Sequence, residues 1–212
     1  MFFLRLISLP AIMATLFVVL PVSAMGQSAS LIGTELSLRT QSQATPTSEL
    51  FVTSFPASAR VTAPEVEFPD VASLFDPSVG VPPGFANSLV DVAIDAGEDF
   101  IEIDFTNSAP FFQFASGFQN TYVFTFDSTV DLQLTNATID DSVTTLGLTP
   151  DRIDFVGDEL FVNVESLPFN TTTFARINLN AVAVPEPSSL LLLSGFGVSA
   201  LARRRRRTQI GT

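Results

Sequence analysis

Carboxylates are almost the only side chains in this sequence that could do chemistry. The chain of 212 residues holds 22 Asp and Glu, and it contains no histidine, cysteine, lysine or tryptophan. Nucleophilic catalysis by serine usually needs a neighbouring base such as histidine, and zinc and copper sites are built on histidine or cysteine. Paired carboxylates could hydrolyse a glycoside, but among so many acids some pair always looks suitable. We therefore predict that the protein is not an enzyme, and we keep a carboxylate glycosidase as the last alternative.

Calcium is the metal that acidic loops could hold, because it takes oxygen ligands alone. The candidate ligands are Asp95, Glu98 and Asp99, which cluster around Gly97. They do not match the D-x-[DN]-x-[DN]-G pattern of a calcium loop, so solvated acidic loops are the other interpretation. We predict no cofactor, with calcium as the exception to test, and we keep a calcium-assisted module that binds glycans or proteins as the alternative function.

The elements that position these acids are expected to be β-strands, because apolar and polar residues alternate through the middle of the chain. In residues 100–105, Ile101 and Ile103 share one face while Glu102 faces water. The same period of two recurs in residues 90–94, 122–126, 130–134, 160–164 and 175–181, and more weakly in residues 34–38, 50–55 and 59–61.

Short turns separate the predicted strands, at residues 96–97, 107–110, 149–151 and 156–158. The polar stretch Thr40 to Ser48 is the best candidate for a longer loop, with a turn around Pro46. Strands with one wet face and frequent short turns predict an all-β domain over residues 25–183. We expect an antiparallel β-sandwich, jelly-roll-like in its connections.

The charge of the chain lies mostly on this domain. Between residues 25 and 202 all 22 acids face only four arginines, so the balance is 4 − 22 = −18. Such a surface repels nucleic acid and anionic membranes, so we predict no nucleic-acid partner. Seventeen of the 21 phenylalanines fall in residues 25–183 and can supply a core that needs no disulfide.

The N-terminus, residues 1–24, is typical of a secretory signal peptide. Arg5 supplies the positive charge, residues 6–20 are apolar, and Val22-Ser23-Ala24 places small or apolar residues at the −3 and −1 positions. We predict export and cleavage by signal peptidase after Ala24, with Gly26 as another −1 residue and an uncleaved anchor as the other interpretation.

The C-terminus, residues 184–207, has three parts in a fixed order, and a tail of residues 208–212 follows it. The first part is the stiff, extended stretch Val184, Pro185, Glu186 and Pro187. Residues 190–202 are uncharged and mostly apolar. As a helix they reach about 20 Å, short of a hydrocarbon core of about 30 Å. We predict a short transmembrane helix, since Ser188, Ser189 and snorkelling arginines narrow the gap. The last part is Arg203, Arg204, Arg205, Arg206 and Arg207. These arginines place that end in the cytoplasm and the prolines on the exported side.

This order of parts resembles the Pro-Glu-Pro C-terminal sorting signal (PEP-CTERM) of exported proteins in Gram-negative bacteria. The resemblance implies that an exosortase, a membrane protease, recognises the tail and cleaves near Pro185 to Pro187. It also implies that the domain is held in the periplasm by an inner-membrane anchor and is then delivered to the cell envelope or extracellular matrix. Proteins with this signal commonly accompany gene clusters for polysaccharide production, which makes exopolysaccharide a candidate partner. A permanent anchor and a buried core helix are the competing interpretations of the tail.

The body also resembles, more loosely, an uncharacterised β-domain found with the same tail. The residues that carry this resemblance are 66–69, 118–126, 146–149 and 153–164. It supports the predicted fold and implies no activity. Our prediction from the whole sequence is a non-enzymatic, exported surface or matrix protein that an exosortase sorts.

Overall fold

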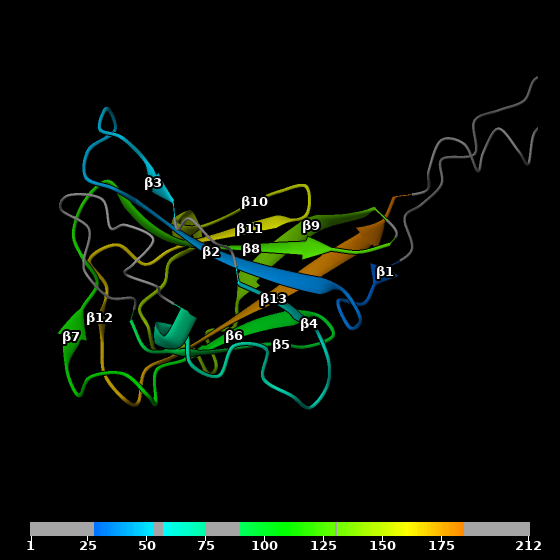
Figure 1. Cartoon of the computed structure of the whole chain (residues 1–212), viewed down its shortest axis with the longest axis horizontal. Coiled ribbons are helices and arrows are strands. Elements are labelled where there is room, and N and C mark those ends of the chain that lie inside the picture. The colour runs from blue at the N-terminus through cyan, green and yellow to red at the C-terminus, as the bar shows by residue number, and fades with distance from the viewer. Residues whose placement is uncertain (1–27, 53–56, 75–89, 130, 185–212) are drawn as a thin grey trace, which may run out of the picture.

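The computed structural model describes residues 28–52, 57–74, 90–129 and 131–184, and about half of them lie in antiparallel strands (Figure 1). We call the first sheet sheet A; it contains β1 (Ser28–Ala29), β5 (Ala93–Ala96), β6 (Phe100–Asp104), β9 (Leu132–Ile139) and β13 (Phe174–Ala183). Sheet B contains β2 (Glu35–Gln43), β3 (Phe51–Val52), β4 (Ala57–Arg60), β8 (Gln119–Asp127), β10 (Ile153–Val156) and β11 (Glu159–Asn163). A small ribbon joins β7 (Phe112–Gln113) to β12 (Pro168–Phe169), and two 3-10 turns are η1 (Ala72–Leu74) and η3 (Pro150–Arg152).

Strand β13 organises sheet A. It pairs with β9 along one edge, and along the other edge it pairs first with β6 and then, nearer its end, with β1. Strand β5 completes the sheet through its hairpin with β6. In sheet B the order is β10, β11, β8 and β2, and β3 and β4 share the outer edge of β2. The chain crosses between the sheets from β8 to β9 and from β9 to β10, as in a Greek-key sandwich.

The core lies between the inner faces of the two sheets. Sheet B contributes Leu36, Leu38, Tyr122, Phe124, Phe126, Leu160 and Val162, and sheet A contributes Ile94, Ile101, Ile103, Leu134, Ala175, Ile177 and Leu179; all are buried in one cluster. These are the apolar faces that the alternation predicted, so the prediction of an all-β antiparallel sandwich is confirmed. Val130, which was assigned to the same face as Leu134, lies outside the described residues.

One loop prediction is partly wrong. The stretch Thr40 to Ser48 begins as strand, because β2 continues to Gln43 and pairs with residues 119–122 of β8. The sequence does not reveal this part of the strand, because residues 40–43 are all polar and show no alternation of apolar and polar side chains. The turn around Pro46 is confirmed, and the Ser48 amide donates to the Thr45 carbonyl at 3.0 Å.

The two ends of the sandwich differ, and both matter below. At the terminal end, β1 pairs with the last residues of β13. At the far end lie the β7–β12 ribbon and the loop after β2 (Figure 1). Within the described ranges the structure contains no helix of the length and apolarity that crossing a membrane requires.

Candidate functional site

The first candidate site is the point where the predicted sorting signal leaves the domain. Strand β13 is paired to its last residue, since Ala183 lies opposite Leu132 of β9. The next residue, Val184, is still held, because its amide donates to the Asp131 carbonyl at 2.8 Å. The fold therefore reaches the first residue of the predicted signal without a linker.

The N-terminal side of the described chain lies at the same place. Ser28 pairs with Val182 and Ala29 pairs with Ala181, so β1 lies beside the C-terminal end of β13. The chain thus enters and leaves the domain side by side at the terminal end (Figure 1). The predicted cleavage residue Ala24, the residues Pro185, Glu186 and Pro187, and Arg203 to Arg207 lie outside the described residues.

The second candidate site is the acidic loop between β5 and β6. Asp95 stands on the outer face of β5, opposite Glu102 of β6, whereas Glu98 and Asp99 are exposed at the turn. The backbone carbonyls of Glu98 and Asp99 accept from the Leu31 and Leu179 amides at 2.9 and 2.7 Å, so they tie the turn to both neighbours. Within the described part of the chain, no three acidic side chains are placed to hold a metal ion.

Glu67 joins this acidic face from a distant part of the sequence. Its two carboxylate oxygens accept from the Thr62 amide at 3.0 Å and from the Ala96 amide at 2.7 Å. Burial raises the pKa of Glu67, while the backbone amides oppose that rise and the charge of Asp95 adds to it. Burial also raises the pKa of Asp95, and the nearby charge of Glu102 acts in the same direction. Two partly buried carboxyls therefore share a small region beside a third.

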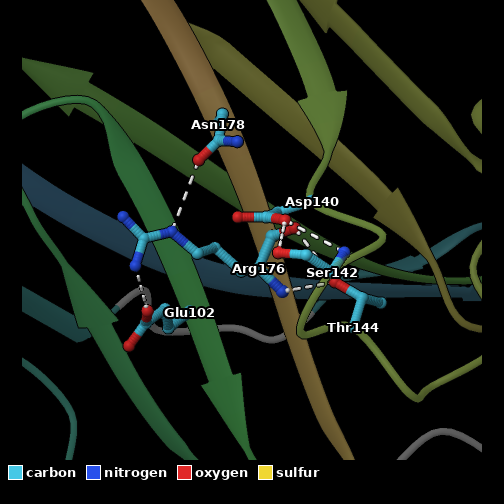
Figure 2. A network of polar contacts seen from close by, with 6 residues as sticks. All are labelled: Glu102, Asp140, Ser142, Thr144, Arg176 and Asn178. Carbon is cyan, nitrogen blue, oxygen red and sulfur yellow. Dashed lines mark hydrogen bonds and ion pairs between the residues drawn. The ribbon is translucent and has the colours of Figure 1, made fainter.

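Arg176 of β13 is the cation that pairs with this acidic face, through Glu102 (Figure 2). Its Nη1 donates to Glu102 Oε1 at 2.8 Å, and its Nε donates to Asn178 Oδ1 at 3.3 Å. The guanidinium also lies over the ring of Phe100, with 3.7 Å from its carbon to the ring centroid. Such stacking on an aromatic face adds to the attraction of the ion pair.

The loop after β9 closes over the same strand (Figure 2). Thr144 Oγ1 accepts from the Arg176 amide at 3.0 Å and donates to the Arg176 carbonyl at 3.2 Å, and the Asp140 amide donates to that carbonyl at 2.9 Å. The Asp140 carboxylate in turn accepts from the hydroxyl and the amide of Ser142. The hydroxyl of Ser142, followed by its amide, lowers the pKa of Asp140.

This network joins three elements: β6, β13 and the loop after β9. Arg176 already donates to two side chains, and Asp140 already accepts from Ser142. The contacts of Arg176, Thr144 and Glu67 could not be predicted from the sequence, because they join residues far apart in the chain. The one signal was the scarcity of cations in so acidic a domain, which makes each internal arginine a candidate for an ion pair.

Comparison with known proteins identifies the tail. Residues 183–207 match the model of the PEP-CTERM protein-sorting motif. The match begins at the last residue of β13 and includes the prolines and the arginine block. It supports an exported protein that passes through the membrane and is sorted by an exosortase. The motif covers only this tail, so the resemblance of the body to a known β-domain stays a prediction. No curated protein and no solved structure matches the chain.

Proposed function

We propose that the chain is a non-enzymatic envelope or matrix protein, whose acidic β-sandwich is exported, held at the inner membrane by its tail and released by exosortase cleavage. The delivered part is the domain, which then resides in the cell envelope or in the exopolysaccharide layer. The sorting motif at residues 183–207 is the observation that carries the proposal.

The arrangement of the chain ends supports this use. The signal peptide and the sorting tail are predicted at opposite ends of the sequence, yet Ser28 and Val182 are paired neighbours. Both membrane-directed segments therefore leave from one end of the domain. The body can stand clear of the bilayer while either segment is inserted.

The composition and the polar networks support the absence of an enzymatic role. The chain lacks histidine and cysteine, and its acidic face is braced by Arg176. The charge balance of residues 25–183, 4 − 21 = −17, keeps the domain soluble and holds it away from anionic lipid headgroups. A folded, acidic body without histidine or cysteine suits a component of a hydrated extracellular layer.

The test is fractionation of cells that make the full chain together with an exosortase. The variant Pro185→Ala with Pro187→Ala removes the stiff, extended backbone of the motif and should remain in the inner-membrane fraction, while the unaltered chain leaves it. The control, Pro46→Ala with Pro110→Ala, changes two exposed prolines of the domain and should leave the membrane normally. Equal release of the unaltered chain and the first variant would contradict the proposal.

A further inference from the structure

The last residues of β13 are paired along both of their edges. Ala181 and Val182 each have one partner on β9 and another on β1. The side chain of Ala181 is also buried in the core cluster. A protein that takes up an extended peptide does so through the free backbone groups of that peptide, and a strand with both edges filled has no such edge to offer. The end of β13 is therefore closed to a protease until the sheet opens locally.

The pairing ends at the point where the sorting motif begins. Ala183 pairs only with β9, and Val184 keeps one backbone hydrogen bond, from its amide to the Asp131 carbonyl at 2.8 Å. The next residue, Pro185, has no N–H with which to extend the pairing. The sorting motif matches from residue 183 onwards, so the paired strand and the motif meet within two residues.

A cut inside the end of β13 would damage the domain. Among the described residues, the only strand that pairs with β1 is β13, and those pairs are made by Ala181 and Val182. Cleavage before these two residues would leave β1 without a partner and would also remove the pairs that they make with β9. A cut that follows Val184 leaves every pair of sheet A in place.

We propose that the end of β13 limits the stretch that the exosortase recognises: the enzyme uses the tail from Val184 onwards, and the mature protein keeps β13 complete. This inference rests on the proposed function, since it takes exosortase cleavage as given. The carbonyl of the broken peptide bond belongs to Val184 or a later residue and passes to water or to another nucleophile, while the tail leaves with the new amine. Recognition is thus one-sided, because the residues before Val184 stay in the sheet.

The first test bridges β13 to β9 in the full chain, in cells that carry an exosortase, and exploits the absence of cysteine. Val182→Cys with Gln133→Cys places two thiols on opposed residues. Such residues have Cα atoms about 4.5–5.5 Å apart, which a disulfide spans. Gel mobility without reductant shows whether the bridge has formed. The bridged chain should leave the inner membrane at the rate of the two single-cysteine chains, whereas a need to open the strand would slow it at least about tenfold.

A second bridge, two residues further on, should have the opposite effect. Val184→Cys with Asp131→Cys ties the first residue of the recognised stretch to the sheet, next to the hydrogen bond that joins the two backbones. Release should be lost in this bridged chain, or already in Val184→Cys alone if the enzyme recognises the valine itself. Unhindered release of the bridged chain would overturn the inference, because recognition would then not include Val184.

The mass of the released domain gives an independent readout. It should end at Val184 or a later residue, and a Gly-Ser-Gly-Ser insertion between Ala183 and Val184 should move the cut by the length of the insertion. A new C-terminus before Val184, or retention of the bridged Val182→Cys with Gln133→Cys chain while the single-cysteine chains leave, would overturn this inference alone. Retention of the unaltered chain would contradict the proposed function, and the inference with it.

Discussion

The internal arginines connect neighbouring strands and turns of this acidic domain. Arg39 pairs with Glu159 at 2.7 Å on sheet B, and Arg176 pairs with Glu102 on sheet A. Arg152 instead donates to the backbone carbonyls of Asn163 and Glu165 at 3.3 and 2.8 Å. Three of the four arginines in the body thus brace neighbouring strands or turns, beyond offsetting charge.

The substitution Arg176→Met should destabilise the domain. It keeps much of the packing over Phe100 but removes the ion pair with Glu102 and leaves that carboxylate beside Asp95. We expect a loss of about 1 kcal/mol in the free energy of unfolding, from an ion pair and a cation–π contact of ordinary strength. This corresponds to a melting temperature lower by roughly 2–4 °C, measurable by calorimetry.

The matched control is Arg60→Met, which makes the same change of charge at an exposed residue of β4. Its effect should stay within about 0.5 kcal/mol. Equal destabilisation by the two substitutions would mean that net charge alone, and not the Arg176 network, accounts for the loss.

Asp95 should make stability depend on pH in a predictable direction. Its pKa is raised above the ordinary 3.8, chiefly by burial, so the folded protein holds this proton more tightly than the unfolded chain does. The resulting stabilisation is fully present below the ordinary pKa and is lost as the pH rises through the raised pKa. Asp95→Asn should therefore raise the free energy of unfolding at pH 7.

The gain should shrink as the pH falls towards 3.8, because the carboxyl of the unaltered protein then becomes neutral too. Denaturant unfolding between pH 7 and pH 4 measures it. Glu49→Gln removes one charge from an exposed loop and is the control. If Asp95→Asn instead weakened the domain at pH 7, the carboxylate would have a stabilising partner that this account lacks.

At the level of elements, the strands with one wet face were predictable and the others were not. The alternation in residues 100–105, 160–164 and 175–181 follows directly from burial on one side. Strands β1, β7 and β12 have two residues each, so only their tertiary partners define them. Strand β10 was not predicted from the sequence, and none of its four residues is fully buried.

The same distinction explains what was predictable of the site. The three-part tail is local, and its order can be read along the chain. The acidic face depends on register, since Asp95 meets Glu102 across a hairpin and Arg176 meets Glu102 across β13 and β6. The approach of Glu67 depends on a segment that pairs with β5 only through an isolated bridge at Phe68 and Ile94. Alternation fixes faces but not these partners.

A pair of valines on one hairpin tests the assignment of faces. Val162 of β11 is completely buried, whereas Val156 of β10 is 66% exposed. Val162→Ala should lower the free energy of unfolding by about 1–3 kcal/mol, from lost burial and the cavity left behind. Val156→Ala should stay within about 0.5 kcal/mol. Urea unfolding measures both, and similar losses from the two would contradict the packing of sheet B.

At the level of the whole molecule, the two ends of the sandwich carry different features. The terminal end receives and releases the chain where β1 pairs with β13. The far end exposes Phe111 and Phe112. Between them lies an acidic body with a single buried cluster.

The intact mass of the mature protein, recovered from cells that carry an exosortase, tests the central claim most directly. We expect the mass to lack the signal peptide, with cleavage after Ala24, and to lack the five arginines at residues 203–207. Any mass added at the new C-terminus would reveal an attached group. A mature, envelope-associated protein that retains Arg203 to Arg207 would contradict exosortase processing and leave a permanent anchor in its place.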